Sequence, residues 1–141
     1  MDKLFINKTH PSLFNTITFL INILDNDKSE QIIKWLEKND PEILFTADSD
    51  RVNSEVRKIV FQNYFKKTCI ENTFWISHNR SFSVEMIAKF GNSKDNFNYL
   101  ISIIENTNNH FRFIISALDL LVYMTYLLLI MVNFKPFYFQ N

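Results

Sequence analysis

Glycine is nearly absent from this sequence of 141 residues, which contains only one, Gly91. A Walker-type phosphate loop needs two glycines and a dinucleotide-binding fingerprint needs three, because only backbone without side chains folds its amides closely around a phosphate. A nucleophile elbow needs a glycine on each side of its serine. One glycine therefore excludes the common glycine-dependent nucleotide and hydrolase sites.

Cysteine and histidine are also scarce. Cys69 is the single cysteine, so it forms neither an intrachain disulfide nor a cysteine-rich metal site, and we predict that it is a small buried apolar residue in a reducing compartment. His10, His78 and His110 lie far apart without the spacing of a helical zinc protease. Cys69 and His78 lack the third group that would make them a nucleophile and its base. We predict no catalytic residue, no metal site and no cofactor.

The charge balance favours neither sign. Fifteen Lys and Arg residues match fifteen Asp and Glu residues, so the basic face that nucleic-acid binding requires is not expected. The first twelve residues lack the apolar stretch and cleavage site of a secretory signal. We expect a cytoplasmic protein that does not bind nucleic acid.

The apolar residues, 47% of the chain, recur at helical spacing, and no alternating run competes for a strand. Their pattern predicts a helix over residues 11–24, one after Ser29, a short turn opened by Pro41, and a helix capped by Asn53 or Ser54. Further helices are expected after Ser83, after Ser93 and from about residue 110. On the helix after Ser54, we expect one apolar stripe formed by Val56, Ile59, Val60 and Tyr64.

Gly91 follows the short helix after Ser83, where we expect it to terminate that helix in a left-handed conformation. The two tryptophans, Trp35 and Trp75, stand in strongly apolar stretches and are expected in the core. The acid pairs Asp48 with Asp50 and Glu30 with Glu37 have no accompanying motif, so we interpret them as caps and solvated surface.

The C-terminal region is strongly apolar. Residues 113–134 form a run of about 20 residues interrupted only by Asp119, which is near the length that spans a bilayer. A charge in lipid is costly and the flanks carry few charges, so we favour an interior helix of a stack over a membrane anchor. An unpaired end of such a stack leaves an apolar surface that we expect to associate with a protein partner or with a second copy.

Two longer helices open at Ser54 and Ser93, a spacing close to the roughly 40 residues of a HEAT repeat. We therefore predict an all-α fold, a short HEAT-like α-solenoid or helical stack of about six or seven helices. It forms a single helical domain over 1–141, with a lead-in over 1–10, a repeat region over 11–121 and an apolar helix and tail over 122–141.

Several segments also resemble a known family. Ile33–Val52 contains a Trp-Leu helix and an Asp-Pro-Glu-x-Leu motif, and Ser54–Phe65 begins with Glu-x-Arg after its serine. Together with Phe90–Ser93 and Asn109–Leu121, they are similar to the linker and HEAT-like repeats of bacterial NACHT-type STAND NTPases. The resemblance covers about residues 11–121. It implies a scaffold or sensor role in a signalling NTPase, with a possible place in defence against phages, and a gene fragment that lacks the ATPase module.

Two alternatives stay open. One is a compact, Bcl-2-like viral helical bundle that binds a host signalling protein, with the last helix at its hydrophobic centre. The other is a small tail-anchored protein associated with the membrane through residues 113–134. An open stack leaves one side of the last helix exposed, whereas a bundle surrounds it.

Overall fold

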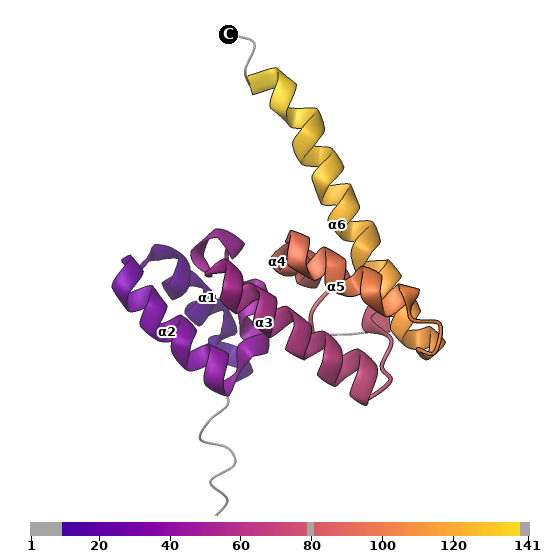
Figure 1. Ribbon diagram of the computed structural model, residues 1–141. Coiled ribbons are helices and arrows are strands. Elements are labelled where there is room, and N and C mark those ends of the chain that lie inside the picture. The colour runs from indigo at the N-terminus through magenta and orange to yellow at the C-terminus, as the bar shows by residue number, and fades with distance from the viewer. Residues whose placement is uncertain (1–9, 79–80, 139–141) are drawn as a thin grey trace, which may run out of the picture. The chain divides into compact units, whose positions relative to one another are not determined.

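The computed structural model describes residues 10–78 and 81–138, and within these ranges the chain is all-α, with no strand (Figure 1). The lead-in expected over residues 1–10 lies outside the described residues except for His10. The α-helices are α1 (Phe14–Ile23), α2 (Asn26–Asn39), α3 (Ser54–Phe65), α4 (Val84–Gly91), α5 (Lys94–Glu105) and α6 (Phe111–Tyr138). The chain divides into two compact units between Val60 and Phe61, within α3.

In the first unit, α1 packs against α2, and both contact the 3-10 helix η3 (Pro41–Thr46). Pro41 opens η3 at a position where its missing N–H is not needed. The short turn expected after Pro41 is confirmed, and its side chains Ile43, Leu44 and Phe45 are buried. The buried hydrophobic residues of this unit are Ile21, Ile33, Leu36, Ile43, Leu44, Phe45, Val52 and Val60.

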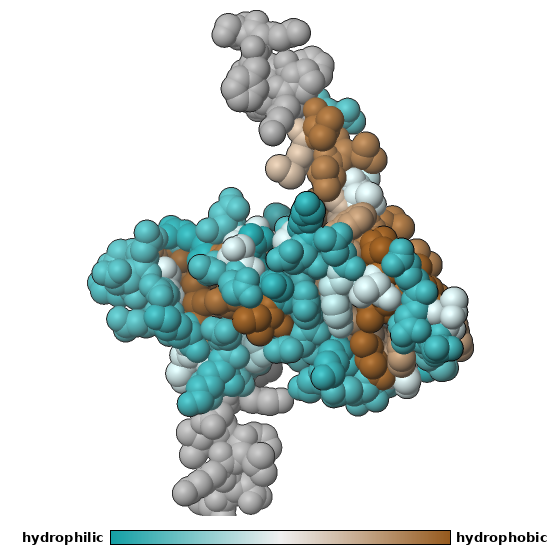
Figure 2. All heavy atoms as spheres, in the orientation of Figure 1, coloured by the Kyte–Doolittle hydropathy of each residue, from teal (hydrophilic) through white to brown (hydrophobic). Residues whose placement is uncertain are grey.

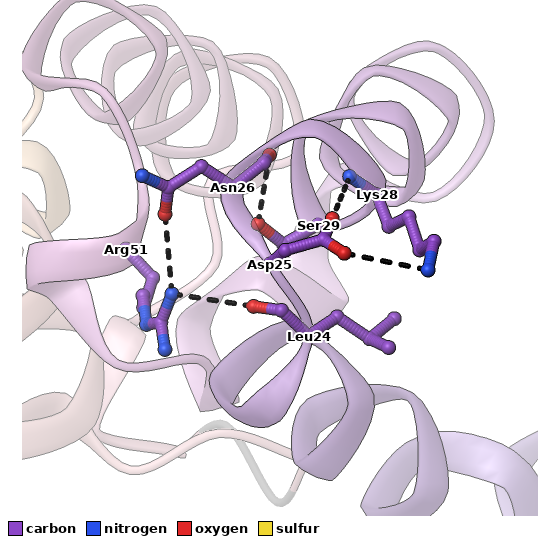
Figure 3. A network of polar contacts seen from close by, with 6 residues as sticks. All are labelled: Leu24, Asp25, Asn26, Lys28, Ser29 and Arg51. Atoms are coloured by element: carbon purple, nitrogen blue, oxygen red, sulfur yellow. Dashed lines mark hydrogen bonds and ion pairs between the residues drawn. The ribbon is translucent and has the colours of Figure 1, made fainter.

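Arg51 ties the end of α1 to the start of α2 (Figure 3). Its guanidinium donates to the carbonyl oxygen of Asn22 at 2.6 Å, to that of Leu24 at 3.5 Å, and to the side-chain oxygen of Asn26 at 3.4 Å. The last carbonyls of a helix have no partner within the helix, and a cation also suits the negative end of the helix dipole. Arg51 therefore acts as a distant cap on α1.

The start of α2 differs from the sequence prediction. Asp25 is the N-cap, accepting from the backbone N–H of Lys28 at 3.0 Å, so the helix begins before Ser29. Ser29 is instead buried, and its hydroxyl donates to the carbonyl of Asn26. The prediction that Ser29 caps this helix was wrong because Asp25, four residues earlier, already satisfies the free N–H groups.

On α3, the predicted cap is confirmed, since the Asn53 side chain accepts from the N–H of Glu55 at 2.8 Å. The predicted apolar stripe is only partly right. Val60 and Tyr64 are buried, whereas Ile59 is 43% exposed, and the residues missed are Phe61 and Phe65, which are almost fully buried. Because α3 is apolar on much of its circumference, its sequence does not show which apolar side chains will be buried.

The second unit is organised around α6. Both α4 and α5 pack against this helix, and so do the π-helical turn η5 (Lys66–Glu71), which continues α3, and the 3-10 turn η6 (Ile76–His78). The predicted caps Ser83 and Ser93 are confirmed, because their hydroxyls accept from the N–H groups of Met86 and Asn96. The largest fully buried side chains are Phe61, Phe65, Ile76, Ile87, Phe90, Leu100, Leu120 and Met124.

Gly91 does not have the conformation that the sequence predicted. It is the last residue of α4 and has no positive φ, so the left-handed terminator was a wrong prediction. A Cβ atom at this position would stand 2.1 Å from Cδ2 of Phe61. Among the described residues, the left-handed conformation belongs to Thr73, whose φ is 48°. Gly91 is therefore needed for close packing.

The tryptophans also lie differently from the prediction. Trp35 is 45% exposed and Trp75 is 38% exposed, so the expectation that both lie in the core was wrong. An indole carries an N–H group that needs a partner, and a half-exposed position supplies one without a buried polar cost. The Trp75 indole N–H donates to the carboxylate of Asp119 at 2.8 Å.

Candidate interaction surface

One side of the first half of α6 belongs to the core of the second unit. Ser116, Ala117, Leu120, Leu121 and Met124 are buried at helical spacing where α6 packs against its neighbours. The buried Ser116 hydroxyl accepts from the N–H of Ile76 at 3.1 Å, which fixes η6 onto the helix. This half of α6 is a structural element with a defined inner face.

The other side of the same helix is apolar and uncovered by any described residue. Phe111, Leu118, Val122, Tyr126 and Leu129 lie on it, and each exposes close to half of its surface or more. Figure 2 shows apolar spheres gathered over the described part of this helix. Soluble monomers rarely expose contiguous apolar patches larger than a few hundred Å2, and larger ones mark interaction sites.

Beyond Met124 the helix loses its inner cover as well. From Thr125 to Asn133 every residue is at least partly exposed, although the segment carries no charge and includes Leu127, Leu128 and Ile130. Figure 1 shows this part of α6 continuing past α4 and α5. We call residues 125–133 the free segment. Only 28% of the most apolar stretch of α6 is buried, which is unlike the core helix of a soluble protein.

Asp119 is the one acidic residue of this helix, and the structure provides it with a partner. Its carboxylate accepts the Trp75 indole N–H, and both residues belong to the second unit. Arg112 donates to the carbonyl of Thr73 at 3.3 Å. The charged groups of Arg112 and Asp119 are thus occupied by neighbouring groups of the same unit.

The first unit has a polar cavity of about 360 Å3. Three of its charged side chains have partners within the chain: Glu30 pairs with Lys34 at 2.8 Å, and Arg51 donates to a carbonyl of α1. The Lys34 ammonium lowers the pKa of the Glu30 carboxyl, first through a hydrogen bond and then through its charge. The lining residues are Asn26, Ser29, Glu30, Ile33, Lys34, Glu37, Arg51, Asn53 and Val56.

The structure shows where the acid pairs that we singled out from the sequence lie. Asp48 accepts from the N–H of Asp50 at 3.2 Å and so caps a short 3-10 turn. Glu30 and Glu37 both line the polar cavity. Within residues 10–78 and 81–138, no three His, Cys, Asp or Glu side chains gather in a way that could hold a metal ion.

Cys69 is fully buried, as predicted. Burial raises the pKa of its thiol from 9.0 to about 11, and a hydrogen bond with Ser116 offsets part of that rise. His78 is exposed and its ring contacts that of Trp75 at a tilt of 43°, with ring centroids 4.6 Å apart. A thiol with a raised pKa is a poor nucleophile, because the thiolate is the reactive form.

No family model, no characterised protein and no solved structure matches this chain. The candidate site is therefore identified from the structure alone. It is the outward side of α6 together with the free segment, where apolar side chains are exposed.

Proposed function

We propose that this protein is a non-catalytic helical interaction module that binds another protein chain through α6. The observation that carries the proposal is the exposure of a long apolar helix whose opposite side is anchored in the core. Burying apolar surface is the main driving force of most protein association, at roughly 25 cal/mol per Å2. An anchored helix presents such a surface without the entropy cost of ordering it on binding.

A membrane anchor is the main rival, since α6 is long and apolar enough to cross a bilayer. The packing of its first half weighs against this interpretation. With Ser116 to Met124 held in the core, the rest of the apolar run, Thr125 to Asn133, rises roughly 14 Å at 1.5 Å per residue. A bilayer core is about 30 Å thick, so a span would require the second unit to release this helix.

The resemblance to the repeats of STAND NTPases gives the setting that we propose, a short HEAT-like stack serving as a scaffold or sensor in signalling. The packing of both α4 and α5 on α6 supports a layered stack. The exposed outer face of α6 weighs against a Bcl-2-like bundle, in which this helix would be surrounded. A cytoplasmic location is part of the same proposal.

Site-specific photo-crosslinking in living cells tests this function. A benzophenone amino acid in place of Leu129 should give adducts with a polypeptide, identified by mass spectrometry, whereas the same probe at Asn98 should not. Asn98 is an exposed residue of α5, on the same unit. Adducts with lipid alone, or equal adducts at both positions, would contradict the proposal.

A further inference from the structure

Seven exposed or partly exposed residues of α6, six of them apolar, recur with a coiled-coil period, whereas the exposed Tyr123 and Met131 lie off this row. Phe111, Ile115, Leu118, Val122, Thr125, Leu129 and Val132 follow one another at alternating steps of four and three, over about three heptads. We call this set the seam. Every member is exposed or partly exposed. Such spacing is typical of a helix that pairs with another helix along its whole length.

The seam lies opposite the buried face of the helix. At about 100° per residue, the seam positions centre on one side of α6 and the buried Ala117, Leu120 and Met124 on the other. A partner helix can therefore dock on the seam without disturbing the core. The Thr125 hydroxyl bonds to the carbonyls of Leu121 and Val122 in its own helix, so this residue adds no unmet polar group to the seam.

We propose that the occupant of the seam is α6 of a second copy of this chain, which specifies the partner in the interaction function proposed above. In a parallel, in-register pair, equivalent positions of the two copies meet, and a seam without charge avoids the like-charge repulsion that would oppose this. The whole chain also has zero formal charge, which leaves no net repulsion between copies. The β-branched Ile115 and Val122 with Leu118 between them match the a and d preferences of two-stranded coiled coils.

The available area suits such a dimer. At on the order of 100 Å2 for each half-exposed large side chain, the seam and the residues beside it offer on the order of 700 Å2 per copy, close to the roughly 800 Å2 that a standard interface buries on each partner. The side chains that supply it are the seam members Phe111, Leu118, Val122, Leu129 and Val132, with Tyr126 and Leu128 beside them.

Sedimentation equilibrium of the purified full chain tests the proposal with a matched pair of variants. Leu129 and Met131 are each 60% exposed and stand two residues apart, but only Leu129 belongs to the seam. We expect a dimer for the wild type and for Met131→Lys, and at least a tenfold weaker dimer for Leu129→Lys. Neither side chain is in the core, so circular dichroism should show both variants folded.

Two results would overturn self-pairing. One is a wild-type chain that stays monomeric at a concentration about 100-fold above a micromolar dissociation constant. A chain that instead floats with phosphatidylcholine vesicles would count against self-pairing in the same way. The other is an equal loss of association in both variants, which would mean unspecific apolar contact. The broader function fails separately: a Leu129 adduct with a different polypeptide would preserve the interaction module and reject the second copy, whereas no adduct would reject both.

Discussion

Gly91 and Phe61 are fitted together so closely that a Cβ atom on the glycine would overlap the phenylalanine ring, at 2.1 Å from Cδ2 and 2.5 Å from Cε2. Both residues belong to the second unit, where Phe61 is fully buried and Gly91 ends α4. The single glycine of the chain thus allows α4 and α3 to approach within the core.

Gly91→Ala should destabilise the protein by about 1–3 kcal/mol through overpacking, although alanine is the better helix former. Urea denaturation measures the change in unfolding free energy. The matched test is Gly91→Ala in a Phe61→Ala background, where the clash is removed and the alanine should be neutral or stabilising. An equal cost in both backgrounds would mean that backbone conformation, and not the Phe61 ring, requires the glycine.

Asn96 is a fully buried polar residue that joins three elements of the second unit. Its amide donates to the carbonyl of Gly91 at 2.8 Å, and its side-chain oxygen accepts from Gln62 at 3.1 Å. Asn96→Ala should cost about 1–3 kcal/mol in unfolding free energy, because it leaves the Gly91 carbonyl without its partner. Asn98→Ala, at an exposed site on the same helix, should cost under about 0.5 kcal/mol. Similar losses from both variants would refute the role assigned to Asn96.

Arg51→Met removes the guanidinium bonds to the last carbonyls of α1 and should speed amide hydrogen exchange in α1 and at the start of α2, by about tenfold for each 1.4 kcal/mol lost. Arg51→Lys keeps the charge but lacks the fork that reaches two carbonyls, so it should recover only part of the protection. Full protection in the lysine variant would show that charge alone accounts for the effect. Exchange in α5 serves as the internal reference.

Cys69 should resist alkylation by iodoacetamide in the folded protein and react after unfolding, because its thiol is buried and its pKa is raised to about 11. The folded state binds the thiol proton of Cys69 more tightly than the unfolded state does. The contribution to stability is therefore fully present below pH 9.0 and is lost as the pH rises towards about 11. Cys69→Ala should remove that part of the pH dependence, and rapid alkylation of the native protein would contradict the burial.

The sequence predicted the features that depend on near neighbours. The caps Asn53, Ser83 and Ser93 follow from a polar side chain that accepts from an N–H two or three residues later, and each is found. Asp25 and Ser29 could both cap α2, and the sequence pattern does not show which of them does. In the structure the N-cap is Asp25.

Features that depend on tertiary packing were harder to predict. The buried face of α3 contains Phe61 and Phe65 in place of Ile59, because the surroundings choose between two apolar sides. The apolar run of α6 was evident from composition, but its division into an anchored half and a free segment was not. In a helix with apolar residues on every side, the sequence does not show which side the neighbouring helices will cover.

A cysteine scan along α6 tests the central claim most directly. In a Cys69→Ala background, single cysteines at Leu118, Val122, Thr125 and Leu129 should form disulfide-linked dimers under mild oxidation, whereas cysteines at the exposed Tyr123 and Met131 should not. We predict cross-linking that follows the seam with a period near 3.5 residues. Cross-linking without that period, or none at any position, would contradict the pairing of two copies through this helix.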